Sequence, residues 1–280
     1  MDRRRLLSLF RASFLLLSLA VNAALAEPLP LWEVGAGVGA ARIPHYRGAN
    51  QYRTWALPVP YVVYRGEILQ LDEHRYRGLF LRSDRTELDI SLSGSPPARN
   101  NEARRGMPDL DATFEIGPTL NVSLLDSRGR DVELELRLPV RAVVATDFSH
   151  FRHTGWIFQP NLDLTVRSVP GFAGWEFALR GDLIFTDRSY NNYFYAVDQA
   201  YATPERPAYS TGGGYAGPGL MASLSKRFPD FWIGGFIKWD SIAGAAFADS
   251  PLVKARTNFT AGFALAWILS TSREKVDADR

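Results

Sequence analysis

The feature that most constrains this chain is a strict two-residue alternation of apolar and polar side chains. Between residues 132 and 144, apolar residues occupy every even position, while four of the odd positions carry Glu133, Glu135, Arg137 and Arg141. A helix, with about 3.6 residues per turn, would scatter these charges around its axis, whereas a β-strand collects them on one face. The segment therefore predicts a strand with one apolar face and one charged face.

The same alternation recurs along the chain, at residues 87–92, 113–124, 156–167, 175–186 and 258–267. Most of these segments are longer than the ~5–6 residues of a typical strand in a soluble sandwich. They are long enough to cross a bilayer, which takes ~9–11 residues of a tilted strand. The chain is therefore predicted to be all-β, an antiparallel transmembrane β-barrel with apolar side chains toward lipid and polar side chains toward the lumen.

We expect about twelve strands. A count of ten to fourteen stays open, because the third and fourth strands are short and weakly patterned. The expected strands are residues 31–41, 54–64, 66–72, 77–83, 86–94, 110–126, 131–146, 153–167, 174–187, 213–227, 231–246 and 256–270. Short turns alternate with mostly longer connections, at 42–53, 95–109, 188–212 and 245–255. In bacterial barrels the short turns face the periplasm and the long loops face outward.

The first residues predict export. A basic head at residues 3–5 precedes a short apolar run that ends on the small residues Ala24 and Ala26, which is the pattern of a secretory signal peptide. We expect cleavage of residues 1–26, which leaves a barrel at 27–271 and a polar, disordered tail at 272–280.

Composition adds two constraints. The chain contains no cysteine, so it has neither disulfides nor the lipid anchor of a lipoprotein. Removing the signal's four arginines and Asp2 from the 32 basic and 30 acidic residues leaves 28 and 29. Bulk charge therefore gives no reason to expect nucleic acid as a partner. The expected surroundings are outer-membrane lipid and lipopolysaccharide.

The strand faces assigned to the lumen carry charges of both signs. Nine of these side chains form the expected charge ladder: Glu133, Glu135, Arg137, Arg141, Asp163, Arg167, Glu176, Arg180 and Asp182. A barrel of about eight strands is filled by side chains, and one of about sixteen leaves a channel. In a barrel of intermediate size we expect opposite charges to pair across the lumen. We therefore favour a largely occluded barrel over an open channel.

A search for catalytic or metal-binding patterns predicts none. The four histidines fall in or beside predicted connections and lack the spacing of a zinc site: His45, His74, His150 and His153. Ser149 and His150, with Asp147 near, raise the alternative of a lipid-modifying barrel enzyme. Neighbours on an extended chain point to opposite faces, however, which disfavours a nucleophile–base pair. We expect no enzymatic activity, no cofactor and no metal.

Two motifs near the start of the predicted barrel carry a family resemblance. The first is Ile43-Pro44-His45-Tyr46-Arg47-Gly48, and the second is Leu57-Pro58-Val59-Pro60-Tyr61-Val62-Val63-Tyr64. They resemble the Pro-x-Tyr-x-Gly loop and the Leu-Pro-x-x-x-Tyr strand of the MipA/OmpV family of MltA-interacting outer-membrane proteins. The resemblance covers nearly all of residues 31–270. The motif residues are Pro44, Tyr46, Gly48, Leu57, Pro58, Tyr61 and Tyr64.

Physical chemistry gives these motif residues structural roles. Pro58 and Pro60 cannot donate backbone hydrogen bonds, so they suit an edge or bulged strand. Four tyrosines are expected in the girdles at the membrane interfaces: Tyr46, Tyr52, Tyr61 and Tyr64.

The resemblance implies a scaffold that bridges a murein synthase and a lytic transglycosylase in cell-wall assembly. Murein lies on the periplasmic side, so partner contacts are expected at the short turns and in the tail. The candidate contact residues are Arg65, Arg85, Arg128 and Arg130. A small-solute channel is the second hypothesis, and a lipid-modifying enzyme is the third.

Overall fold

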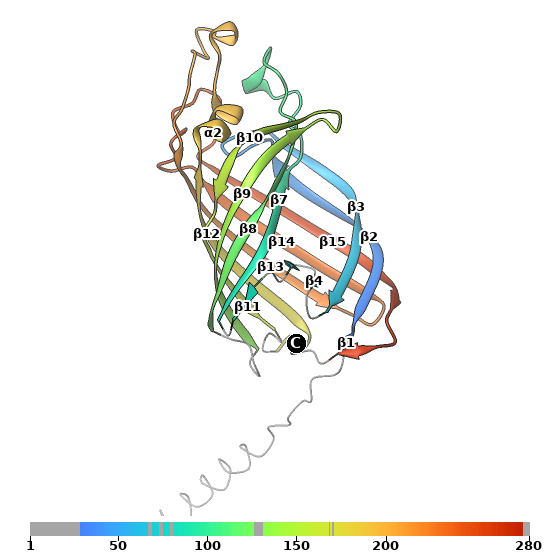
Figure 1. Cartoon of the computed structure of the whole chain (residues 1–280). Helices are drawn as coiled ribbons and strands as arrows, with labels where there is room; N and C mark the ends of the chain where they lie inside the picture. Colours follow the sequence, from blue (N-terminus) through green and yellow to red (C-terminus); the bar gives the residue numbers. More distant parts are fainter. Residues whose placement is uncertain are drawn as a thin grey trace, which may run out of the picture.

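The fold was examined in a computed structural model (Figure 1) that describes residues 29–66, 69–72, 75–78, 81–83, 85–125, 131–167, 169 and 171–276. The expected signal peptide therefore lies outside the described residues. No helix in the described part of the chain is long and apolar enough to span a bilayer.

The described residues form sixteen strands, one α-helix and two short 3-10 helices. The strands are β1 (Leu29–Pro30), β2 (Trp32–Pro44), β3 (Tyr52–Arg65), β4 (Leu69–Asp72), β5 (Arg75–Gly78), β6 (Leu81–Arg82), β7 (Thr86–Ser95), β8 (Ala112–Leu125), β9 (Val132–Thr146), β10 (Phe151–Phe158), β11 (Asn161–Val166), β12 (Trp175–Thr186), β13 (Gly214–Arg227), β14 (Phe231–Ser241), β15 (Thr257–Thr271) and β16 (Lys275–Val276). The helices are η1 (Glu102–Arg104), α2 (Arg188–Tyr195) and η2 (Gln199–Tyr201).

All strands except β1 and β16 belong to one antiparallel sheet of fourteen strands. β15 pairs with β2, so the last long strand closes the wall against the first. β10 and β11 are two parts of one wall strand, because both pair with β9 and β12 and the break falls at Gln159 and Pro160. With β10 and β11 counted as one strand, the described wall has thirteen strands, within the expected range of ten to fourteen. The predicted antiparallel barrel of about twelve strands is confirmed.

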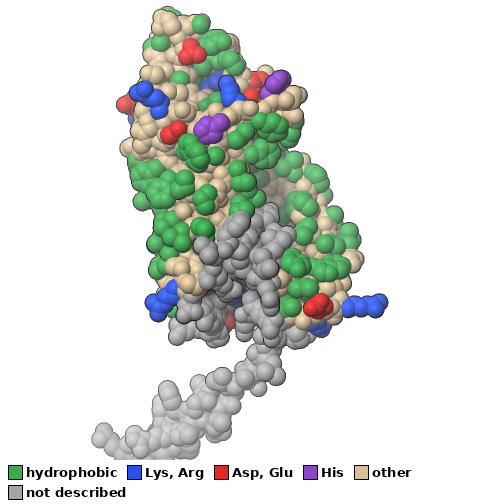
Figure 2. Space-filling view, in the orientation of Figure 1, with side chains coloured by type: hydrophobic (Ala, Val, Ile, Leu, Met, Phe, Trp, Pro, Cys, Tyr) green, Lys and Arg blue, Asp and Glu red, His purple; other side chains and the backbone are tan. Residues whose placement is uncertain are grey.

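The wall is apolar on the outside. Large apolar side chains are exposed around it, as expected where lipid replaces water: Val38, Leu92, Phe114, Ile116, Leu120, Leu162, Leu183, Leu220, Ile237, Phe259 and Phe263. Figure 2 shows hydrophobic side chains along the flank of the barrel and charged side chains gathered toward its two ends. The outward face of the alternating pattern is therefore the lipid face.

The largest cluster of buried apolar residues lies at one end of the barrel, where the long loops meet. These loops are residues 45–51, 96–111, 187–213 and 242–256, and together they form a folded layer that we call the cap. α2 belongs to the cap and lies at the upper end of the molecule in Figure 1. The expectation that residues 188–212 are a plain connection is thus wrong for 188–195.

α2 is short, and two local features support it. The Asp187 carboxylate caps its first turn by accepting a hydrogen bond from the Tyr190 backbone N–H at 2.9 Å. Gly155 of β10 has a φ of +138°, and a Cβ there would lie 2.4 Å from the Tyr190 nitrogen. Glycine at 155 therefore lets the helix pack against the barrel wall.

The cap also changes the expected end of one strand. β14 ends at Ser241 rather than at residue 246. Ile242 and Phe247, which follow it, turn inward and are almost fully buried in the cap. Burial in the loop cluster thus overrides the continued strand that we predicted.

The tail is ordered as far as residue 276. β16 pairs with β1, the Leu31 N–H donates to the Glu274 carbonyl oxygen at 2.9 Å, and the Ser272 N–H donates to the Trp32 carbonyl oxygen at 2.9 Å. The expected disorder is therefore wrong for residues 272–276, because their backbone groups form hydrogen bonds with those of residues 29–32 near the start of the barrel. Residues 277–280 lie outside the described part.

Candidate functional site

The nine charge-ladder residues lie together along one wall of the lumen. Four come from β9, Asp163 comes from β11, Arg167 follows β11, and the other three come from β12. Their ion pairs join neighbouring strands. The expectation that opposite charges pair across the lumen is therefore wrong, because adjacent strands bring partners of opposite sign to the same height.

Arg141 is the most buried arginine of this wall. Its Nε lies 2.9 Å from Glu115 Oε2, and its two terminal nitrogens donate to Ser91 Oγ at 3.1 Å and to Gln159 Oε1 at 2.5 Å. Three partners on three strands compensate for the loss of water around the guanidinium. Glu115 is not among the nine residues expected in the ladder, although it alternates correctly on β8.

Asp163 is the second centre of the wall. It accepts two hydrogen bonds from Arg180, one of them from Nε at 3.0 Å, and Arg137 approaches it at 3.9 Å. Arg137 also donates to Asn121 Oδ1 at 3.2 Å. The Asp163 carboxylate is almost fully buried, so this cluster keeps a negative charge stable inside the barrel.

The remaining ladder residues extend the wall in both directions. Arg167 lies 2.7 Å from Glu133 and 3.8 Å from Glu176. Asp182 accepts a hydrogen bond from Gln159 Nε2 at 3.0 Å, and Glu135 is buried opposite Asp163 in the strand register. The wall is thus a continuous polar network rather than a row of solvated charges.

A second buried charge cluster lies where the short turns are. Glu33 is 0% exposed and is held by Arg65 at 2.9 Å and by Arg227 at 2.8 Å. Arg65 also donates to the Pro30 carbonyl oxygen at 2.8 Å. Arg65, which we expected to contact partners, thus ties the rim of the barrel together instead of extending from it.

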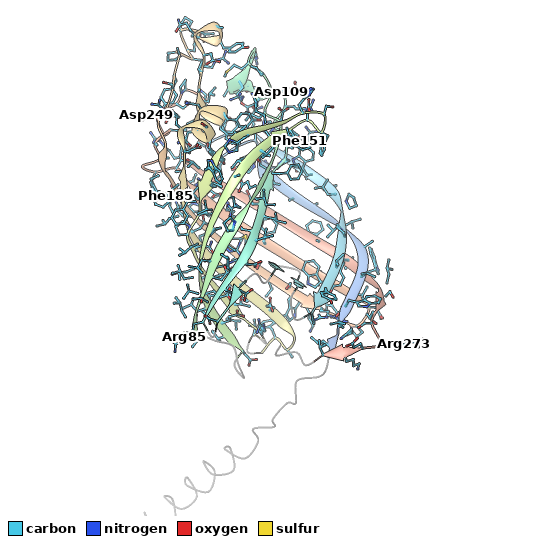
Figure 3. All side chains as sticks on the ribbon, in the orientation of Figure 1. Arg85, Asp109, Phe151, Phe185, Asp249 and Arg273 are labelled. Atoms are coloured by element: carbon cyan, nitrogen blue, oxygen red, sulfur yellow. The ribbon has the colours of Figure 1, made fainter. Side chains whose placement is uncertain are left out.

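The other predicted contact residues differ in position. Arg85 is exposed beside β7 and lies at the same end of the barrel as Arg273, opposite Asp109 and Asp249 in the cap (Figure 3). Arg128 and Arg130 lie outside the described residues. Among the predicted turn arginines that the structure describes, Arg85 is therefore the exposed one.

The first family motif builds the cap. Pro44 ends β2, and the hydroxyl of Tyr46 donates to the Leu252 carbonyl oxygen at 2.8 Å. Gly48 has a φ of +86°, and its N–H donates to Asn258 Oδ1 at 2.6 Å. These bonds connect the loop after β2 to the loop before β15 and to the start of β15, across most of the chain.

Aromatic packing completes the cap. The rings of Tyr195 and Phe247 stack with centroids 3.7 Å apart, and the Tyr46 ring meets Tyr195 edge-on at 6.0 Å. Burial raises the pKa of Tyr46 to about 12. Burial also lowers the pKa of Arg104, whose guanidinium donates to the carbonyl oxygens of Phe194 at 3.0 Å and Pro108 at 3.2 Å. The cap is therefore a folded unit with a buried aromatic core.

The second family motif forms β3. Tyr61 is 4% exposed inside the barrel and packs near Trp232. The expected place in an interfacial girdle is therefore wrong for Tyr46 and Tyr61, because both are buried. Leu57 faces the interior and Pro58 the exterior of the same strand, while Tyr64 is half-buried near its end.

The residues considered for chemistry lie at the outer surface. Asp147 accepts backbone hydrogen bonds from Ser149 at 2.9 Å and His150 at 2.8 Å, which lower its pKa. Burial and the nearby Arg53 lower the pKa of His45. Among the described residues, no group of three or more Asp, Glu and His side chains could hold a metal ion.

Solved structures of two outer-membrane proteins resemble the chain weakly. A bacterial polysaccharide outer membrane secretin has 6% identity and a TM-score of 0.41, covering 85% of this chain and 99% of its own. The outer membrane protein OprG of Pseudomonas aeruginosa has 10% identity and a TM-score of 0.23, covering 86% and 94%. At these scores neither structure bears on the function of the chain.

Sequence relatives are more informative. The family model of the MltA-interacting protein MipA matches residues 36–269. The outer membrane protein OmpV of Vibrio cholerae serotype O1 is 24% identical over 219 residues, which cover 73% of this chain and 75% of the relative. Since the family match spans both motifs and nearly the whole barrel wall, the chain belongs to the MipA family and is an outer-membrane β-barrel protein.

Proposed function

We propose that this protein is a non-catalytic scaffold that holds a murein synthase and a lytic transglycosylase at the inner face of the outer membrane. It reaches that membrane through cleavage of the signal peptide at residues 1–26. The observation that carries the proposal is the cap, because its long loops are committed to one another through Tyr46, Tyr195 and Phe247. Loops folded in this way favour a structural barrel over an open pore.

Two further observations support docking on the periplasmic side. The family is described by its interaction with MltA. The rim formed by the short turns carries exposed charges of both signs, the basic Arg85, Arg273 and Lys275 and the acidic Asp131, Asp230 and Glu274, which can pair with charges on a partner. The short turns offer only a small docking surface, so we expect a modest affinity for a partner enzyme.

The test is photo-crosslinking in intact cells from probes at Arg85 and Arg273. Probes at Arg99 and Arg105, which are exposed arginines of the cap, serve as the matched control. Capture of murein synthase or lytic transglycosylase from the rim but not from the cap is the expected result. Rim probes that capture neither enzyme, while the cap probes work normally, would contradict the scaffold.

A charge reversal checks specificity. Arg85→Glu combined with Arg273→Glu should reduce capture, whereas Arg99→Glu should leave it unchanged, because only the rim faces murein. Equal capture from both variants would contradict docking at the rim.

A further inference from the structure

The described part of the barrel wall has a gap between β3 and β7. β3 pairs with β4 only at Tyr64 and Arg65, and β7 pairs with β6 only at Glu87 and Leu88. Among the described strands, none pairs with residues 52–60 or 90–95 on the sides away from β2 and β8. The unpaired edges of β3 and β7 therefore border an opening in the half of the wall nearer the cap.

The sequence of β3 fits such an edge. Pro58 and Pro60 lie two residues apart, so their backbone nitrogens point to the same side of the strand. Neither nitrogen carries a hydrogen, so a strand placed along this side would lack two donors. The missing partner is therefore consistent with the sequence of the motif itself.

A cavity of about 720 Å³ lies behind the gap. Its lining joins the two edges, at Leu57 of β3 and Ser93 of β7, to the opposite wall, at Met221 and Phe236. No described lining residue is charged, in contrast to the charge ladder. The volume falls within the roughly 300–1,000 Å³ of pockets that bind small molecules.

The mouth of the cavity opens toward lipid. Phe114 of β8, which belongs to the exposed apolar band, also borders the cavity. In Figure 2 the surface is hollowed between the part of the wall formed by β7 and that formed by β3. A molecule that enters here comes from the hydrocarbon of the outer leaflet, because the cap lies on the outer side.

A cation lies at the outer end of the cavity. The Arg53 guanidinium is 4.5 Å from the centre of the Trp55 ring, and Trp55 lines the cavity. Arg53 is exposed and forms no ion pair among the described residues. It can therefore meet an anionic group while apolar side chains below it surround a hydrocarbon chain.

We propose that this cavity binds an alkyl chain of an anionic amphiphile, which enters sideways between β3 and β7 and places its head group at Arg53. The same chemistry occurs in free fatty acids and in membrane lipids with anionic heads.

The test uses the full-length barrel in nanodiscs and a photoreactive palmitic acid that carries a diazirine near the end of its chain. Irradiation should label residues that line the cavity, and unlabelled palmitic acid should compete. Leu57→Trp fills the cavity and should reduce this labelling about tenfold, as expected for a steric change in an apolar pocket. Label restricted to the outer apolar band would overturn the proposal.

Val38→Trp is the matched control. Val38 is 58% exposed on the lipid face of β2, and Leu57 is 57% exposed on the inward face of β3. Neither substitution crowds a closed core, and heat-modifiable migration in gels verifies that both variants fold. Equal loss of cavity label in the two variants would overturn the proposal.

Two further arms address the head group and the source. Arg53→Gln should weaken labelling by the photoreactive palmitic acid but not by the alcohol with the same chain and diazirine. Equal effects on the two probes would show that Arg53 does not bind the anionic head group. A phosphatidylglycerol whose acyl chain carries the diazirine tests a membrane lipid. If the lipid probe labels the cavity, the source is the bilayer, and if only the acid does, it is free fatty acid. No cavity label from either probe would overturn the proposal.

Discussion

At the scale of single residues, the barrel interior contains buried charged side chains. Burying each one alone costs free energy, and their ion pairs and hydrogen bonds offset that cost. Arg141 and Glu115 lie 2.9 Å apart and are both buried. Taking two such ions out of water costs more than their attraction returns unless further hydrogen bonds are made. Ser91 and Gln159 supply those bonds, so removing one partner leaves the others without compensation.

Replacing Arg141 should therefore be severe. Arg141→Met is expected to lower the free energy of unfolding by about 3–5 kcal/mol, because Glu115 becomes an uncompensated buried charge. Urea titration of the barrel in lipid vesicles, followed by gel migration, measures the loss. The double variant with Glu115→Leu should recover most of it.

Arg167 is the control for this experiment. It pairs with Glu133 at 2.7 Å, but its side chain is 47% exposed. Arg167→Met should cost less than Arg141→Met because water already reaches the Arg167 guanidinium, but more than the loss of a surface pair because Glu133 is itself buried. Equal losses at positions 141 and 167 would contradict the role of burial.

At the scale of elements, the cap is a packing unit built on one end of the wall, and its core also includes Val143, Ile157 and Ile184 of the wall strands. Its buried aromatic rings come from loops that are far apart in the chain, while the strands beneath are held by their own backbone pairing. The two layers therefore depend on different interactions, and a change in one need not unfold the other.

Phe247→Ala tests this independence. The substitution removes the ring that stacks on Tyr195 and should cost about 3–5 kcal/mol, as for other buried aromatic residues. We expect proteolytic cleavage within the cap loops 187–213 and 242–256 to become faster while the heat-modifiable migration of the barrel stays unchanged. Phe185→Ala, on the lipid face, is the control that should leave cleavage unchanged. Loss of the folded barrel on Phe247→Ala would show that the cap and wall form one unit.

The wall was more predictable from the sequence than the cap. Alternation is local, so the inward face of β9 could be identified without knowledge of its neighbours. The partners of Arg141 could not, because Glu115 and Gln159 come into reach only through the register of β8, β9 and β10. α2 was missed because it is short and is supported by packing against β10. The capping residue Asp187 was the one local signal that could have indicated it.

At the scale of the whole molecule, the lumen is divided. The cap lies at the end that carries the long loops, the charge ladder lines one wall, and Tyr61, Val63 and Trp232 pack near the opposite rim. The uncharged cavity beside β3 lies between these parts. This arrangement favours exchange with the bilayer over passage along the barrel axis.

Conductance measures that difference. The wild-type protein inserted in planar bilayers should give little steady current, because the long loops are folded together into the cap at one end of the barrel. The protein is delivered to the planar bilayer from lipid vesicles, and heat-modifiable migration of protein recovered from these vesicles verifies that the barrel is folded. Large, steady single-channel currents would contradict obstruction and support a small-solute channel instead.

The pairing of the two ends of the chain bears on how the barrel is assembled. β2 and β15 are neighbours in the wall, and β1 and β16 join beside them. A chain that stops early therefore cannot close its wall, and it presents the free edges of two strands to other molecules. A chain that includes β15 pairs its last wall strand with its first. A chain truncated before β15 leaves the edge of β2 unpaired, and that exposed edge is open to aggregation and to proteases.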